Sequence, residues 1–338
     1  MGLSKGLQWL AMAAVLVGVG SVAQAQSFCV YDPAGASGDF YSMARDYQIA
    51  AKLWNVSLQL RPYTDDSKLD ADFKAGKCDM ASMLGMRARA YNKFTGTIDA
   101  PGALANYVQV RSALNLMAEP HLARYMVDNG FETVGIVPVG GAYAVTADRN
   151  VNTFDKAAGK RIAVMEWDPV QAEAAQEAGV VPVPTQLSQF GTLFNTGKVD
   201  IIFAPMTLYK ALDMDRGVGT KGGIIRRPLA ELTMQYITHA ERFPAGFGQH
   251  SRQFVTSFTD HAITTARYSE SQVDDRVWLY AMHQQLQEWQ VIMSGLRERL
   301  ADKGIYDRRM LSVLLRVRCA DAPSESECAA ANEQVSQR

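Results

Sequence analysis

Residues 157–205, AAGKRIAVMEWDPVQAEAAQEAGVVPVPTQLSQFGTLFNTGKVDIIFAP, decide the fold of this chain. Three short apolar runs (GKRIAVMEW, VVPVPTQ and VDIIFAP) are separated by two segments typical of helices, PVQAEAAQEAG and LSQFGTLFNTGK. Short strands that alternate with helices of this length indicate βαβ units and a parallel sheet. The stretch therefore predicts a βαβαβ unit of an α/β protein.

An earlier stretch, residues 27–82, follows the same course. It contains the strand-like segments SFCVYD, VSLQLRPY and KCDMASM, an amphipathic helix over 39–54 and a short helix over 68–75. Both units end on a Gly-Lys turn that leads into an apolar-acidic pair, Gly76-Lys77-Cys78-Asp79 and Gly197-Lys198-Val199-Asp200. We predict two similar α/β lobes that face one another, with a cleft between them for a small molecule.

Composition is consistent with this fold. A chain of 338 residues with 48% hydrophobic residues is long enough for two α/β domains with full cores. The chain has 34 basic and 35 acidic residues. This balance argues against a broad electrostatic attraction to nucleic acid or to an anionic membrane.

The N-terminus has the pattern of an export signal. Lys5 is followed by an apolar stretch over 7–20 and by the A-x-A sequence Ala23-Gln24-Ala25. A retained membrane anchor is the alternative, but the apolar stretch is short for a membrane span. We expect residues 1–25 to be a cleaved signal peptide.

Four cysteines in an exported chain favour two disulfides over a metal site, because there is no C-x-x-C motif and no Cys/His cluster. Cys29 and Cys78 open strands that are neighbours in a sheet ordered 2-1-3, so we predict that they pair. Cys319 and Cys328 would then close a local loop near the C-terminus. Four free buried thiols are the alternative.

One long helix is predicted over 271–300. Ser271-x-x-Asp274 resembles a capping box, and apolar residues recur at three- and four-residue spacing as far as Leu300. Such a helix is about 45 Å long, enough to lie across both lobes; a coiled coil is the alternative.

Two strands are expected at 133–139 and 142–147, joined by Gly140-Gly141, and another over 233–238 returns to the first lobe. The expected domains are a first lobe (26–145 and about 230–268), a second lobe (146–229), the bridging helix (269–302), a C-terminal helix (303–320) and a tail (321–338).

The order of these motifs resembles the periplasmic solute receptors of TRAP transporters. The resemblance is carried by Asn129-Gly130-Phe131, by the run from Asn152 to Ile162, by Gly197-Lys198-Val199-Asp200 and by Ala204-Pro205, and it ends near Arg318. SFCVYDPAGASGDFY, FKAGKCD and GMRARAYNKFTGTIDAPGAL are similar to the AdeT-type solute-binding proteins. The resemblance implies a two-lobed periplasmic-binding-protein fold of type II, a periplasmic location, and delivery of a solute to a membrane permease.

The chain departs from the TRAP pattern at the expected ligand site. The family's arginine, which grips a ligand carboxylate with its forked guanidinium, falls on Ala163, and the family's asparagine falls on Ala204. A simple C4-dicarboxylate ligand is therefore in doubt. We expect Arg87, or alternatively Arg161 or Arg89, to replace the missing arginine.

Ligands of open α/β sheets bind beyond the carboxyl ends of the strands. The turn at Ser37 could present N–H groups to an anion there, or could serve only as a helix cap. Trp167 and Tyr143 could stack on a flat ligand, and Glu166 or Asp168 could meet an amine or a hydroxyl. The predicted binding residues are Ser37, Tyr63, Ser82, Arg87, Tyr143, Arg161, Glu166, Trp167 and Phe203.

Catalysis finds no support in the sequence. There is no G-x-S-x-G or H-E-x-x-H motif, and the five histidines are scattered without ligand spacing. Gly217-Val218-Gly219-Thr220-Lys221-Gly222 formally matches G-x-G-x-x-G but precedes a strand, the reverse of a dinucleotide site. We expect a protein that captures a small polar or carboxylate-bearing solute in the cleft between its lobes and delivers it to a membrane transporter, without cofactor, metal or nucleic acid. An adaptor for an efflux or other envelope complex, with a vestigial cleft, is the alternative.

Overall fold

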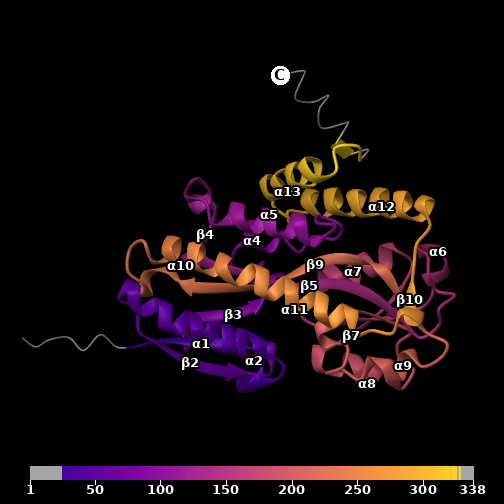
Figure 1. Ribbon diagram of the computed structural model, residues 1–338, viewed down its shortest axis with the longest axis horizontal. Coiled ribbons are helices and arrows are strands. Elements are labelled where there is room, and N and C mark those ends of the chain that lie inside the picture. Colours follow the sequence, from indigo (N-terminus) through magenta and orange to yellow (C-terminus); the bar gives the residue numbers. More distant parts are fainter. Residues whose placement is uncertain (1–24, 326, 329–338) are drawn as a thin grey trace, which may run out of the picture.

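The computed structural model describes residues 25–325 and 327–328. The described strands form one mixed sheet in the order β2-β1-β3-β9-β5-β8-β6-β7, with β4 beside β5 and β10 beside β9 (Figure 1). The signal peptide predicted over 1–25 lies almost wholly outside the described residues. The strands are β1 (Gln26–Tyr31), β2 (Leu58–Tyr63), β3 (Met80–Leu84), β4 (Val127–Asp128), β5 (Phe131–Thr146), β6 (Arg161–Met165), β7 (Val181–Thr185), β8 (Ile201–Pro205), β9 (Gly223–His239) and β10 (Trp278–Leu279).

The two predicted βαβαβ units are confirmed. In the first, β1 lies between β2 and β3 and pairs parallel with both; in the second, β6 lies in the same way between β7 and β8. The connecting helices are α1 (Asp39–Ala51) and α2 (Asp66–Lys74) in the first unit, and α7 (Pro169–Glu177) and α8 (Phe190–Asn195) in the second. Below, "first lobe" means the sheet half with β1 to β3, and "second lobe" the half with β6 to β8.

The repeated Gly-Lys turns have the same structure in both units. Gly76 and Gly197 adopt positive φ angles of 71° and 68°, which glycine tolerates at the end of a helix. The following Lys77 and Lys198 donate their N–H groups back to Asp72 and Leu193, closing the helix ends.

The acidic residues after these turns, Asp79 and Asp200, make equivalent hydrogen bonds in the two units. The Asp79 and Asp200 carboxylates accept hydrogen bonds from the N–H groups that open the first strand of each unit, Ser27 at 2.7 Å and Arg161 at 2.9 Å. The repeated Gly-Lys-x-Asp pattern therefore fastens the third strand of each lobe to the first.

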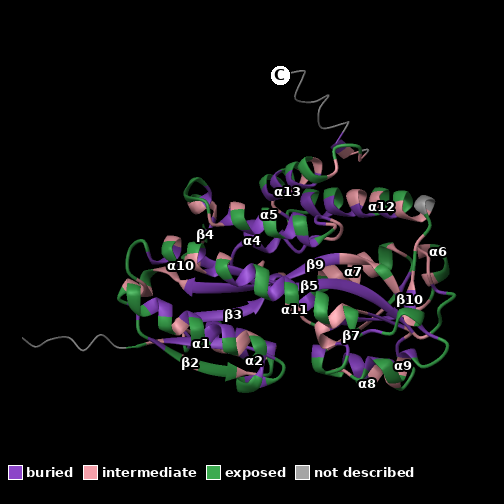
Figure 2. Cartoon of the chain, viewed as in Figure 1, coloured by how far each residue is buried: buried purple, intermediate pink, exposed green. Residues whose placement is uncertain are grey.

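Two long antiparallel strands, β5 and β9, connect the lobes. The two expected strands around Gly140-Gly141 are one continuous strand, and the strand expected over 233–238 is the last part of the longer β9. Their pairing shifts register between Pro138 and Gly140 and again after Ala142. Such bulges bend a strand without ending it, which is why glycines that suggested a break do not interrupt β5. Figure 2 shows how extensively these central strands are buried.

The prediction of one helix over 271–300 is wrong. Ser271 is the last residue of α11 (Thr259–Ser271), and Asp274 caps a single 3-10 turn by accepting the N–H of Arg276. Trp278 and Leu279 then pair with Ile224 and Ile225 of β9. Backbone pairing and burial of Trp278, which is 5% exposed, override the helical spacing of the sequence. The helix resumes as α12 (His283–Asp302).

A layer of helices covers one side of the central strands (Figure 1). Arg297 of α12 donates to the carbonyl of Pro101, and Arg299 of α12 forms an ion pair with Glu177 of α7 at 3.1 Å. This 20-residue helix thus contacts both lobes, as the longer predicted helix was meant to do. The remaining helices are α3 (Gly85–Ala88), α4 (Lys93–Gly96), α5 (Tyr107–Met117), α6 (Phe154–Ala157), α9 (Met214–Val218), α10 (Phe247–Val255) and α13 (Arg308–Asp321).

Both predicted disulfides are confirmed, Cys29 to Cys78 and Cys319 to Cys328. The second holds the segment after α13 against the helical layer, where the Glu327 carboxylate pairs with Arg297 and Arg318. Both arginine side chains are only 6% exposed, so two buried cations share this one acid. Among the described helices, none is long and apolar enough to cross a membrane.

Candidate functional site

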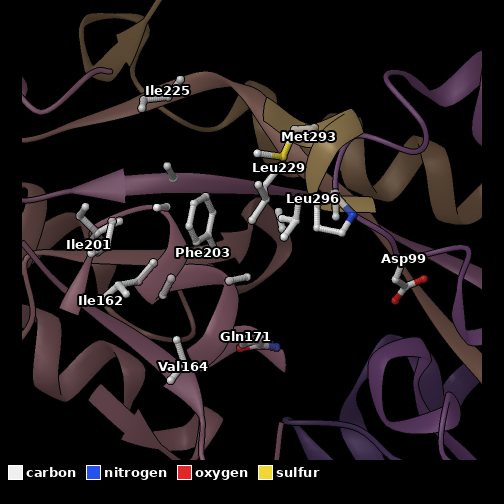
Figure 3. Close-up of a pocket in the computed structure, with 18 of the residues that line it drawn as sticks. Asp99, Ile162, Val164, Gln171, Ile201, Phe203, Ile225, Leu229, Met293 and Leu296 are labelled. Carbon is white, nitrogen blue, oxygen red and sulfur yellow. The ribbon is translucent and has the colours of Figure 1, made fainter. Parts of the chain in front are cut away.

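A cavity of about 800 Å³ lies between the two lobes and under α12. Its walls come from β5 and β9, from β6, β8 and α7 of the second lobe, and from α12 (Figure 3). Asp168 and Thr207, which line it, follow the carboxyl ends of β6 and β8. The cavity therefore has the position that the strand-end rule assigns to ligands in this class of fold.

Apolar side chains make up most of the wall around the centre of this cavity. Figure 3 shows them converging from three directions: from β6 and β8, from β9, and from α12. Ligand pockets are usually lined in this way, with few polar groups that fix the orientation of the ligand. The apolar groups labelled there are Ile162, Val164, Ile201, Phe203, Ile225, Leu229, Met293 and Leu296.

The lobes touch on one side of the cavity. The Arg89 guanidinium of the first lobe pairs with Asp168 of the second at 3.0 Å. Beside it, the guanidinium carbon of Arg87 lies 3.9 Å from the ring centre of Trp167. Gln171 Nε2 donates to Met86 Sδ at 3.1 Å. These contacts make the structure a closed arrangement of the two lobes.

Asp99 is a buried acid on the cavity wall, 5% exposed. It accepts hydrogen bonds from the backbone N–H of Thr233 at 3.2 Å and from its hydroxyl at 2.6 Å. Burial raises the pKa of Asp99 to about 7, although the Thr233 hydrogen bonds and the charge of Arg89 oppose the rise. Burial therefore favours the neutral form of this carboxyl more than water does.

Two further polar atoms on the wall have no hydrogen-bond partner among the described residues. They are Oγ1 of Thr207, just after β8, and Nε1 of Trp289 on α12. A buried polar group without a partner costs free energy. Both residues line the cavity, but these two atoms are themselves buried in its wall.

The structure places Phe203 in the cavity and the predicted arginines elsewhere. Arg161 binds Asp200 and the carbonyl of Gly197, within the repeated strand-fastening motif. Arg87 is buried and pairs with Asp66 and, at 3.2 Å, with Asp70. Both guanidiniums are already neutralised by the chain's own acids, and neither lines the cavity.

Ser37, Tyr63 and Ser82 also lie outside the cavity wall. The exposed Ser37 hydroxyl donates to the carbonyl of Ala34, and Tyr63 donates to Asp72. Ser82 is fully buried in β3. The Ser37 turn does not cap α1 with a side chain, because Asp32 accepts the N–H of Tyr41 instead.

The three remaining predicted residues border the site without lining it. Tyr143 of β5 is buried, and its hydroxyl donates to Glu270 of α11 at 2.9 Å. Glu166 is exposed, and Trp167 packs under Arg87 at the contact between the lobes. Contact of any of these residues with a solute stays a prediction.

Several cavity residues were not predicted from the sequence. Asp99 lies in a loop between helices, and Met293 and Leu296 lie on a helix whose course was wrongly predicted. Arg227 lies on the part of β9 that precedes the strand expected over 233–238. The run Ile224-Ile225-Arg226-Arg227-Pro228 has no alternating pattern that would have revealed it. Ala163, where the TRAP pattern has its arginine, does line the cavity.

Comparison with solved structures supports the fold. A TRAP periplasmic solute-binding protein from Desulfovibrio salexigens with bound orotic acid has 10% sequence identity and a TM-score of 0.70, and the match covers 88% of this chain and 98% of that one. The periplasmic ectoine-binding protein of a TRAP transporter from Halomonas elongata has 13% identity and a TM-score of 0.68, with 89% and 99% covered. The predicted type II periplasmic-binding-protein fold is thereby confirmed.

Sequence comparison is more specific. The probable solute-binding protein AdeT1 of Acinetobacter baumannii is 37% identical over 304 residues, which cover 90% of this chain and all of that protein. The family model described as "Solute-binding protein AdeT 1/2" matches residues 48–333. The match extends beyond Arg318, so the tail that we had placed outside the resemblance belongs to it. The chain is a member of the AdeT 1/2 family of solute-binding proteins, which are not enzymes.

Proposed function

We propose that this protein captures a small solute in the cavity between its lobes, outside the cytoplasm, and delivers it to a membrane permease. The single observation that carries the proposal is the cavity itself. It is large enough for a drug-sized molecule, residues that follow β6 and β8 line it, and Arg89 and Asp168 join the two lobes beside it. An adaptor with a vestigial cleft would not need such a space.

The other features of the chain support an extracytoplasmic role. The solved structures that it resembles are described as periplasmic, with bound orotic acid in one case. Two disulfides fit an oxidising compartment, and the N-terminal pattern fits export. Closure around a solute by movement of the lobes about β5 and β9 would give a permease a distinct form to recognise.

A thermal-shift screen of polar, carboxylate-bearing and apolar metabolites tests this function. A solute that binds only the folded form raises the melting temperature in proportion to the logarithm of its excess over Kd. We expect a saturable rise with at least one class of solute, and loss of the rise when Ala163→Trp fills part of the cavity. No shift from any class, together with co-purification of envelope proteins, would favour the adaptor.

A further inference from the structure

We propose that the solute of this protein has a large apolar body and one anionic group, and that Arg227 anchors the anionic group. This inference rests on the proposed solute-binding function and assigns a ligand class to the same cavity. It combines two observations, the apolar wall and an arginine on that wall without a protein partner.

The size and lining of the cavity argue for the apolar body. A four-carbon dicarboxylate would fill roughly a third of 800 Å³, if each non-hydrogen atom takes about the volume share of a water molecule. The rest of the wall around it would be the side chains of β6, β8 and α12, including Ile162, Phe203 and Leu296. Such a surface is best covered by hydrocarbon, which gains free energy when it leaves water.

The geometry of β9 turns Arg227 toward this wall. Ile225, Arg227 and Leu229 all line the cavity, as alternate residues of one strand face do. Arg226 lies on the opposite face, where its guanidinium covers the rings of Trp278 and Tyr280. In the pairing with β5, Ala142 faces Ala230 and Tyr143 faces Pro228, which leaves Leu229 as the extra residue of a bulge. The bulge keeps Leu229 and Ala230, which are consecutive, both on the cavity wall.

Arg227 is the cationic lining residue that the protein leaves available. Within the described part of the chain, Arg89 pairs with Asp168 and Arg299 with Glu177, whereas Arg227 forms no ion pair or hydrogen bond. The charge of Arg227 lowers the pKa of Glu231, whereas burial of the Glu231 carboxyl raises it. A half-buried guanidinium can bind a carboxylate or sulfonate through two parallel hydrogen bonds.

A cationic solute fits the same cavity less well. Asp99, the buried acid that could bind a cation, already accepts two hydrogen bonds from Thr233. Burial also raises its pKa, which favours the neutral form of this carboxyl more than water does. Asp168 is neutralised by Arg89 and Glu177 by Arg299, and Asp155, at the start of α6, is exposed to solvent.

The test compares four probes of defined chemistry on the purified protein: decanoate, decanol, decyltrimethylammonium and succinate. Affinities are measured at pH 7.5 by calorimetry and by tryptophan fluorescence, since Trp289 lies on the cavity wall. We expect decanoate to bind about tenfold or more tightly than each of the other three, because it alone satisfies both the apolar wall and Arg227.

Variants then assign the anionic preference to one residue. Arg227→Gln should reduce decanoate affinity to that of decanol, and Arg226→Gln, its neighbour on the opposite strand face, should leave both affinities unchanged. Arg227→Lys keeps the positive charge but cannot form two parallel hydrogen bonds to a carboxylate. It should fold even if Arg227→Gln does not, and it should lose only part of the preference for decanoate over decanol.

Each other outcome overturns the inference in a recognisable way. Decanol or the cation binding as tightly as decanoate, or an unchanged preference in Arg227→Gln, would refute the anionic anchor while the binding function stands. Succinate binding alone would refute the apolar body. If no probe binds and the metabolite screen also gives no shift of the melting temperature, the proposed function fails as well.

Discussion

At the scale of single residues, the burial of its acidic partners distinguishes an arginine that stabilises the fold from an arginine at the surface. Arg87 neutralises Asp66 and Asp70, whose side chains are 9% and 10% exposed, whereas Arg161 and Asp200 are 44% and 32% exposed. Arg87→Ala would leave the buried Asp66 without a cation and would leave Asp70 with Lys74 alone, so we expect a loss of about 3 to 5 kcal/mol in the free energy of unfolding. Arg161→Ala should cost about 1 kcal/mol or less. Urea unfolding measures both, and equal losses would contradict this account of Arg87.

Glu231 gives a pH dependence at the same scale. Burial and the nearby charge of Glu270 raise its pKa from 4.5 to about 8, and no described group donates to its Oε2. Because the folded state holds this proton more tightly than the unfolded state, the contribution of Glu231 to stability is full below pH 4.5 and is lost as pH rises toward 8.

The matching prediction is that Glu231→Gln, which cannot ionise, flattens the fall of melting temperature between pH 5 and 8. At pH 8 the variant should melt on the order of 2 °C or more above the parent protein. Melting curves across this range measure the effect, and a parallel curve for the two proteins would show that Glu231 stays charged in the fold.

At the scale of elements, the sequence predicts what local pattern determines. The βαβαβ units follow from strand and helix patterns, and the duplicated Gly-Lys-x-Asp turns fix the strand order that brings Cys29 to Cys78. The course after Ser271 could not be predicted, because the segment around Trp278 takes its structure from a pairing with β9, more than fifty residues earlier. For the same reason the sequence missed Arg227, whose strand is defined by its partner β5.

The two disulfides should differ in their contribution to stability. They join residues 49 and 9 positions apart, and a longer loop loses more chain entropy in the unfolded state when it is closed. Replacing Cys29 and Cys78 by alanine should cost about 4 kcal/mol, and replacing Cys319 and Cys328 about 3 kcal/mol. Chemical unfolding of the two double variants measures this order. A larger loss from the C-terminal pair would mean that the segment holding Glu327 supports the helical layer more than loop length suggests.

At the scale of the whole molecule, the account depends on two lobes that enclose a cavity. The predicted site residues that failed to reach it, such as Arg161 and Tyr63, lie near strand ends but serve contacts inside one lobe. The rule about strand ends locates the cavity, whereas the residues that line it depend on helix α12 and on the bulges of β5 and β9. Neither feature is visible in local sequence patterns.

Native mass spectrometry of the gently purified protein tests the central claim most directly. We predict a small molecule that stays with the folded chain, is released on denaturation, and is absent from Ala163→Trp, whose added ring occupies the cavity. An apparent mass equal to that of the bare chain, even after exposure to the solutes of the growth medium, or a bound molecule that the cavity-filling variant retains, would contradict it.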